Sequence, residues 1–510
     1  PPASTAVPGS LYGQQGIQVQ LGSDGRYEGV RIDGGTGDVV MHSAGSLSLT
    51  QASDHAEQRT QQLDGNAWAK VGNRPGNTGV DGRGYLDHDQ RQSAQTKAQV
   101  AQVDAQGSVR LSSGGDLLLE GTRIGSREAK AGDILLQSGG RLQVTAASNT
   151  QQAEGGGLGG GLELAAKTGA TRGGALGGHF THGKQEENAQ QAVDAQFHSA
   201  GKLALQSRAR EDIALHLEGL HATAEQIDIN AASGGMLIEA SSDRERRNNL
   251  DITAGAGFNQ SKGGTDTYGL HGRAQLNLDK RDNLTWNAGN LRAERIDLQS
   301  RGDTRIEGVS LEAGRIKGEI DGDLRIASRK DNVDTLTVKG DARLSKEKNP
   351  QGYANAASAM TSPLGSKVSA KAGSAASKAD PGFSPTFSLE VSHVQRDSVA
   401  QHTTLKGSEG IDLKVGGDTH LVAAKLQSAK GNVALDTNAV TKQTLSGNDY
   451  RRDVSIDASN SPVDLGTAIA QIAKGKGAAD GENALDLGLL RTSGHNRSEQ
   501  WVSSVQGKAD

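Results

Sequence analysis

Residues 322–331 read GDLRIASRKD, and variants of this stretch recur along the chain. In each copy a glycine stands just before two apolar residues that are two positions apart, and a corner rich in Ser, Asp or Asn usually follows. The copies begin at intervals of 95, 94, 88 and 109 residues, which identifies them as an internal repeat. The other four copies are GSLSLTQASD from 45, GRLQVTAASN from 140, GGMLIEASSD from 234 and the weaker GNVALDTNAV from 431.

The alternation within each copy predicts a short β-strand with one buried face, because successive side chains of a strand point to opposite sides. A second motif lies upstream in four blocks, where a polar turn that ends in Asp leads into another alternating strand, as in GGDLLLEG from 114. Short strands separated by turn residues are typical of a parallel β-helix. We therefore predict an all-β fold, a parallel β-helix (a solenoid) over about 95–440, with hairpin inserts in a super-repeat of about 95 residues. Its interior is expected to contain Leu142, Ile238, Ile326 and Leu435.

The composition agrees with this fold. The 510 residues include 70 glycines but only 14 aromatic residues, and the mean hydropathy is −0.56. A narrow coil stacks small and branched side chains at the ordinary interstrand spacing of about 4.8 Å and has little room for rings. Its corners favour Gly, Asn and Asp, which tolerate positive φ.

Several classes of protein are excluded or disfavoured. The net charge is −5 and no concentrated basic stretch occurs, so no nucleic-acid partner is expected. The chain has no cysteine, which removes disulfides and thiolate metal sites. It also has no window of 18 apolar residues, so no transmembrane helix is expected. The first residues, PPASTAVPGS, do not resemble a signal peptide, and we interpret the chain as an internal piece of a longer polypeptide.

Segments of another character separate the coil blocks. They contain 12 of the 14 aromatic residues and most of the glycine-rich runs, and we interpret each as a hairpin or flap extruded from the coil. Residues 349–381 are rich in Ala, Ser and Lys and are expected to be loose or partly helical. The five segments are 55–92, 150–200, 244–289, 332–408 and 440–510.

Repeats and inserts together divide the chain into five blocks. The first is a partial repeat with its insert, and the next three pair a repeat with a glycine-rich, an aromatic and an Ala/Ser/Lys-rich insert in turn. The last block pairs a repeat with the C-terminal segment. The blocks are 1–92, 93–200, 201–289, 290–408 and 409–510.

Residues 290–328, which begin NLRAERIDLQSRGDTRIEGVSLEAG, carry the clearest form of the repeat. This pattern resembles the haemagglutinin repeats of filamentous haemagglutinin-like exoproteins of two-partner secretion systems, a class that includes contact-dependent growth inhibition effectors. Residues 107–148 and 410–436 match it moderately, and the super-repeat resembles the second repeat region of such effectors. The Asn-Pro-Asn motif of the secretion domain and the Val-Glu-Asn-Asn motif before the toxin do not occur in this sequence.

The resemblance implies a right-handed β-helical filament, monomeric and non-enzymatic, that is secreted to the surface of a Gram-negative bacterium. It implies adhesion or toxin delivery to neighbouring cells, with a target-cell surface or outer membrane as partner and an outer-membrane transporter for the full-length protein. The alternative is a β-helix protein that binds or cleaves polysaccharide. Cleavage needs paired carboxylates over a groove, whereas the acidic residues here fall mostly at corners and the aromatics are dispersed.

Three tempting motifs have structural explanations. The RGD triplet at 301–303 aligns with Gly-Gly-Asp and Arg-Glu-Asp at the same place in other repeats, so only the turn recurs and the triplet is interpreted as a corner. The glycine run at 155–178 lacks a phosphate-binding signature. It is either a sheet packed closely against a neighbour or a segment that rearranges at a membrane. The scattered histidines show no metal-binding spacing, so neither metal nor cofactor is expected.

We expect the inserts to carry recognition, because a bare coil supplies only length and stiffness. Aromatic side chains dominate protein interfaces and favour membrane boundaries. The alternative is that each insert uses its rings as a small core of its own. The candidate partner-binding residues are Trp68, Tyr85, Phe180, Phe258, Tyr268 and Trp286.

Overall fold

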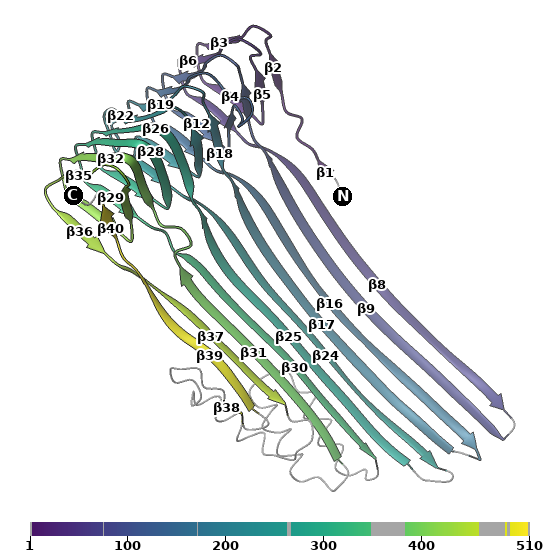
Figure 1. Ribbon diagram of the computed structural model, residues 1–510. Helices are drawn as coiled ribbons and strands as arrows, with labels where there is room; N and C mark the ends of the chain where they lie inside the picture. Colours follow the sequence, from purple (N-terminus) through teal and green to yellow (C-terminus); the bar gives the residue numbers. More distant parts are fainter. Residues whose placement is uncertain are drawn as a thin grey trace.

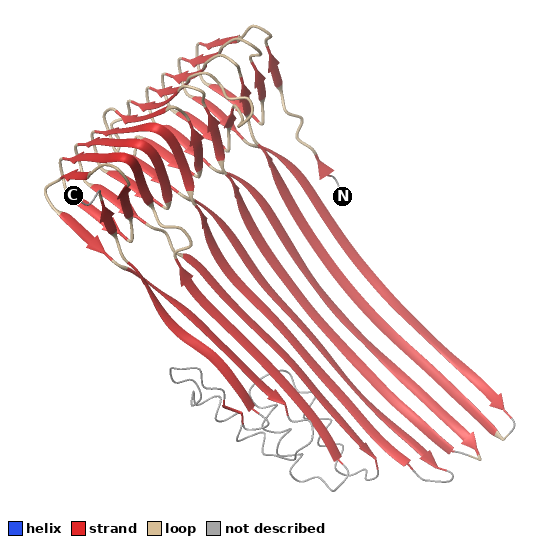
Figure 2. Ribbon diagram, viewed as in Figure 1, coloured by secondary structure: helices blue, strands red, loops and turns tan. Residues whose placement is uncertain are grey.

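The computed structural model describes residues 3–74, 76–170, 172–262, 267–347, 383–457, 485–486 and 490–507. Every regular element in these ranges is a β-strand, and no helix among them could span a membrane. Figure 1 shows a stack of short strands and, extending from one side of it, a set of long strands that lie side by side, and Figure 2 shows strands throughout both parts. The fold of the described residues is all-β, as predicted. Segment 349–381, which was expected to be loose or partly helical, lies outside the described residues.

The stack is a parallel β-helix with three faces. On each face, a strand pairs in parallel with the equivalent strand of the next rung. Strands β26 (Gly289–Ser300), β28 (Val309–Ile320) and β32 (Thr404–Val415) are long and bend across the first two faces.

The first face contains β2 (Ser10–Tyr12), β5 (Arg31–Asp33), β10 (Gln102–Asp104), β13 (Arg123–Ile124), β18 (Ala195–His198), β21 (Leu220–Thr223), β34 (Lys425–Ser428) and β40 (Ser504–Gln506). The second contains β3 (Ile17–Leu21), β6 (Val39–Ser43), β11 (Val109–Ser113), β14 (Ile134–Ser138), β19 (Lys202–Ser207), β22 (Gln226–Ala231) and β35 (Val433–Asp436). The third contains β4 (Gly25–Glu28), β7 (Leu47–Thr50), β12 (Leu117–Glu120), β15 (Leu142–Thr145), β20 (Leu215–Glu218), β23 (Met236–Glu239), β27 (Thr304–Glu307), β29 (Leu324–Ala327), β33 (Thr419–Val422) and β36 (Val440–Gln443).

The core is a set of aliphatic ladders inside this coil. Leu142, Ile238 and Ile326 are fully buried, as the alternation predicted, and Leu435 in a terminal rung is half-buried against the same core. Successive rungs stack like on like, so that Ile238 pairs with Ile306 and Ile306 with Ile326. The ladders explain why so few aromatic residues occur in this part of the chain.

Phe197 is an aromatic residue that does lie within the core. The aromatic content of segment 150–200 assigned it to an insert, but it lies in β18 with no exposed surface and is the largest fully buried side chain. The assignment was wrong because the insert ends earlier, at Val193, and one rung of the coil accommodates a ring.

The Asp corners join neighbouring rungs through side chain to backbone hydrogen bonds. The N–H of Asp323 donates to Oδ1 of Asp303 over 2.9 Å, and the N–H of Asp418 donates to Oδ1 of Asp323 over 2.8 Å. Arg301 of the RGD triplet forms an ion pair with Asp321, 2.7 Å away. The triplet therefore occupies a structural corner.

A second corner requires a left-handed backbone. Gly121 and Gly308 have φ of 58° and 71°, and a Cβ on Gly121 would lie 2.6 Å from that of Ala147, where a hairpin begins. Glycine is favoured because the corner and the root of the hairpin occupy the same space. Ala423 takes the same conformation, with φ of 48°.

The inserts are hairpins, as predicted, but they do not stand apart. In the described part of the chain they form one antiparallel sheet of 12 strands, which lie in chain order except for the last two, and we call it the hairpin sheet. Its strands are β1 (Ala3–Ser4), β8 (Ala52–Arg74), β9 (Asn77–Gln99), β16 (Ala147–Gly169), β17 (Arg172–Val193), β24 (Ser241–Lys262), β25 (Thr267–Asn287), β30 (Asp331–Glu347), β31 (Phe383–Ser398), β37 (Leu445–Asp457), β39 (Leu490–Trp501) and β38 (Leu485–Asp486).

The hairpins can pair with one another because the axial rise of two coil rungs equals the width of two strands in a sheet. Two rungs of the coil separate each hairpin from the next: β12 and β15, for example, lie between the hairpin β8–β9 and the hairpin β16–β17. Two rungs advance the coil by about 9.6 Å, and two strands widen a sheet by the same amount. The hairpins therefore arrive at the spacing that antiparallel pairing requires.

Candidate functional site

The hairpin sheet has two chemically different faces. Residues paired across an antiparallel sheet lie side by side, and alternate residues of each strand point to opposite faces. The pairing runs without interruption from β8 to β30, so each row of paired residues can be assigned to one face. We call the face that carries Leu63 and Leu162 the apolar face, and the face that carries Asp64 and Glu163 the polar face.

The apolar face presents large hydrophobic side chains to solvent. Leu63 and Leu162 are each 70% exposed, and Phe180 is 45% exposed. In the five rows from Leu63 to Val71, none of the described positions on this face of β8, β9, β16, β17 and β24 is Asp, Glu, Lys or Arg. The exposed hydrophobic residues of these rows are Leu63, Val71, Val80, Leu86, Leu158, Leu162, Leu164, Leu176, Phe180 and Phe258.

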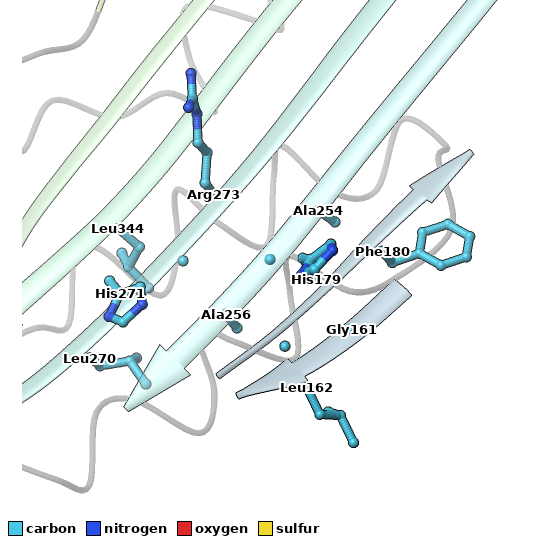
Figure 3. Close-up of a pocket in the computed structure, with 13 residues that line it drawn as sticks. Gly161, Leu162, His179, Phe180, Ala254, Ala256, Leu270, His271, Arg273 and Leu344 are labelled. Atoms are coloured by element: carbon cyan, nitrogen blue, oxygen red, sulfur yellow. The ribbon is translucent and has the colours of Figure 1, made fainter. Parts of the chain in front are cut away.

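A shallow hollow of about 300 Å³ lies in the middle of the sheet (Figure 3). On the apolar face its small lining residues are Gly178, Ala254, Ala256 and Gly272, and its large ones are Leu162, Phe180, Leu270 and Leu344. His179, His271 and Arg273 also line the hollow, although their register assigns them to the polar face. The glycines and alanines make the sheet thin here, which explains part of the glycine run at 155–178.

The polar face carries ion pairs between neighbouring strands, and the part of the apolar face nearer the coil also carries some. Asp341 lies 2.8 Å from Nη2 of Arg273 and 3.0 Å from Nε of Arg343. Partial burial raises the pKa of Asp341, but hydrogen bonds from Arg343 and Arg273 outweigh it and lower the pKa below its usual value. Arg247 likewise reaches Glu187 on the neighbouring strand over 3.1 Å. This face is suited to water.

A cluster of charged residues fixes the root of the hairpin β24–β25 to the coil. Arg329 forms ion pairs with Glu239 over 2.7 Å and with Glu307 over 2.6 Å, and its guanidinium covers the ring of Trp286. His216 Nε2 lies 3.0 Å from Oε1 of Glu239. We call these residues the root cluster.

Two carboxyl groups on the third face of the coil have pKa values that are shifted in opposite directions. Burial raises the pKa of Glu239, but the hydrogen bond from His216 and the charge of Arg329 outweigh it, so the pKa is lowered. Burial also raises the pKa of Glu218, and the neighbouring charges of Glu239 and Asp194 raise it further against the effect of His216. No group of His, Asp and Glu residues in the described part of the chain is arranged to hold a metal ion.

The aromatic residues proposed from the sequence fall into three places. Phe180 and Phe258 are exposed on the apolar face, two rows apart. Trp68 and Tyr85 belong to the polar face, where Arg83 lies 5.9 Å from the centre of the Tyr85 ring. Trp286 belongs to the root cluster, and the side chain of Tyr268 lies outside what the structure describes. They do not form one site.

The aliphatic residues of the apolar face were not among the binding residues predicted from the sequence. Leu158, Leu162 and Leu164 in β16 are separated by even numbers of residues, as are Leu176 and Phe180 in β17, so the members of each set point to the same face of the sheet. This alternation was a usable signal. It was hidden because glycines occupy most of the intervening and neighbouring positions and therefore show no polar partner.

Comparison with known proteins gives a consistent assignment. The chain is 28% identical to a hemolysin of Serratia marcescens over 89% of its own length, and 22% identical to a hemolysin of Proteus mirabilis over 90%. It spans 34% and 33% of those two proteins, about a third of each. No solved structure matches it. The model of the hemagglutinin repeat family matches residues 3–156, 122–254 and 237–342, and the chain belongs to this family.

Proposed function

We propose that this chain is a non-enzymatic part of a large secreted exoprotein on the surface of a Gram-negative bacterium, and that its hairpin sheet binds the lipid membrane of a neighbouring cell. Membrane binding would serve adhesion, toxin delivery as in contact-dependent growth inhibition, or both. The coil acts as a stiff, monomeric filament that positions the sheet. Export of the full-length protein would use an outer-membrane transporter of its own secretion system.

The observation that carries this proposal is the one-sided exposure of hydrophobic side chains on the hairpin sheet. Large exposed apolar patches on soluble proteins mark sites of contact with proteins or membranes. Here the patch is a flat array of mainly Leu, Val, Phe, Ala and Gly without Asp, Glu, Lys or Arg, while the opposite face of the same strands carries charged residues such as Asp64, Asp87 and Glu163. Such a sheet can place one face against acyl chains and keep the other face in water.

The dimensions of the apolar face agree with this role. The rows from Leu63 to Val71 extend over eight residue steps, about 27 Å at the rise of an antiparallel strand. The hydrocarbon core of a bilayer is about 30 Å thick. The name hemolysin, carried by both relatives, also denotes an action on cells, which supports a membrane as the target.

A vesicle flotation assay tests the proposal. Wild-type chain is expected to float with phospholipid vesicles, and the double variant Leu162→Ser/Leu176→Ser is expected to lose affinity on the order of 100-fold, because each buried leucine contributes about 1.5 kcal/mol or more. Trp68→Ser is the matched control, since it removes an exposed large side chain from the polar face. Equal loss in the control, or no flotation of the wild type, would contradict the proposal.

A further inference from the structure

The apolar face ends at the tips of the hairpins with two positive charges. Arg172 is the first residue of β17 and Lys262 is the last residue of β24, and the two are direct partners across the sheet. Both side chains are exposed. Their register places them on the apolar face, two rows beyond Leu176 and Phe258 by way of Gly174 and Gln260.

This arrangement is unfavourable within the protein alone. Like charges directly opposite each other destabilise a sheet. On this face, the rows of Leu176 and of Gly174 contain no Asp or Glu on any strand from β9 to β24. Neither Arg172 nor Lys262 forms an ion pair with another described residue. Nothing in the described part of the chain neutralises the pair.

The position of the pair matches one layer of a membrane. Lys262 lies two residues beyond Gln260, about 7 Å further along the strand. The headgroup layer on each side of a bilayer is about 5–8 Å thick. If the strands run across the bilayer with the apolar face along acyl chains, Arg172 and Lys262 therefore lie at the depth of the headgroups. Arginine and lysine both bind phosphate, arginine through two parallel hydrogen bonds.

We infer that Arg172 and Lys262 form a binding site for the phosphate groups of anionic membrane lipids. The inference rests on the proposed membrane function and deepens it, since it names the class of lipid that the sheet prefers. Phosphate oxygens supply the negative charge that the sheet itself lacks at this point, and the attraction directs the hairpin tips to membranes with a negative surface.

The test compares two kinds of vesicle and two matched variants of the full chain. One vesicle is phosphatidylcholine and the other is phosphatidylcholine with about a third phosphatidylglycerol. Arg172→Gln/Lys262→Gln removes the proposed site. The control Lys167→Gln/Lys339→Gln removes the same net charge from the polar face, where both lysines are exposed. Thermal melting establishes that wild type, both variants and the Leu162→Ser/Leu176→Ser variant of the flotation assay are equally folded.

Wild type and control are expected to bind the anionic vesicles more tightly than the neutral ones. The site variant is expected to bind anionic vesicles roughly 30-fold more weakly than wild type, since each basic residue near an anionic surface contributes about a factor of five. Its binding to neutral vesicles should not change. The preference should also fall as salt is raised.

Four results would overturn the inference. Equal binding of wild type to both vesicles would overturn it while leaving the proposed membrane function intact. An equal loss in the polar-face control would assign the effect to net charge. Release of the bound protein by inorganic phosphate at constant ionic strength would indicate a site for free phosphate. Failure to bind either vesicle would contradict the proposed function together with the inference.

Discussion

The guanidinium of Arg329 lies 4.6 Å from the centre of the Trp286 ring, between the end of a coil rung and the root of a hairpin. The backbone N–H of Trp286 also donates to Oδ1 of Asp331, the first residue of the next hairpin, over 2.8 Å. Two hairpins and the coil thus meet at one tryptophan. These contacts join the hairpin sheet to the coil at this point.

Removing Arg329 should loosen this joint. Arg329→Ala leaves Glu239 and Glu307 stacked on successive rungs with no shared cation, and their side chains are 19% and 14% exposed. We expect a loss of about 2 kcal/mol in the free energy of unfolding. The measurement is chemical denaturation, with Arg26→Ala, which breaks the exposed pair with Glu28, as a control that changes stability little.

Glu218 and Glu239 should have opposite effects on the pH dependence of stability. The pKa of Glu239 is depressed, so its contribution is present above the usual value of 4.5 and is lost as the pH falls. The pKa of Glu218 is raised, so its contribution is favourable below that value and is lost as the pH rises through the folded pKa. Glu218→Gln should therefore stabilise the protein at neutral pH, whereas Glu239→Gln should destabilise it. Unfolding curves at several pH values test the signs, and the same sign for both variants would contradict the assignment.

The coil and the hairpin sheet should respond differently to loss of an aliphatic side chain. Ile326→Ala removes atoms from the fully buried ladder and should cost about 2–5 kcal/mol. Leu162→Ala removes a side chain that is 70% exposed and should change stability little. Thermal and chemical denaturation compare the two. Equal losses would mean that the apolar face is covered in the free protein.

The RGD triplet should be silent in adhesion. Arg301→Ala breaks one exposed ion pair, and Asp303→Glu retains the charge of the corner while it would impair recognition by an integrin-type receptor. We expect both variants to associate with cells as the wild type does. A selective loss of cell association with an unchanged melting temperature would show that the corner is also a ligand.

The match between rungs and strands can be tested by deletion. Removal of residues 304–323 takes out one rung of the coil, between the hairpin β24–β25 and the hairpin β30–β31. The hairpins would then approach with a mismatch of about 4.8 Å. We expect the coil to survive and the pairing of β25 with β30 to become susceptible to proteolysis.

The control for this deletion removes a whole unit. Deletion of 195–287 takes out two rungs together with the hairpin β24–β25 and brings β17 beside β30. The spacing is then preserved, and resistance to proteolysis should be retained. Equal sensitivity of both deletions would indicate that the sheet does not depend on the match.

The coil could be predicted from the sequence because its determinants are local. Each rung repeats a glycine, an apolar pair and a polar corner, and Leu142, Ile238 and Ile326 followed directly from that pattern. The hairpins were also local features, since their strands are neighbours in the chain. Even the RGD corner was recognised by its alignment with other copies.

The site could not be predicted in the same way, because it depends on pairing between hairpins that lie about 95 residues apart. Leu162 and Phe180 face the same side only once the register of β16 and β17 is known. The like charges of Arg172 and Lys262 become neighbours only through the pairing of β17 with β24. Aromatic residues drew attention instead, although they are divided among both faces, the root cluster and, for Phe197, the core.

The equality of two rungs and two strands also sets how such a gene can change. Duplication or loss of a complete unit extends or shortens filament and sheet by the same distance, so recombination between repeats yields a foldable product. Recombination that moves a fraction of a unit leaves coil and sheet out of step. The reach of the filament can thus change by whole units without any new side-chain packing.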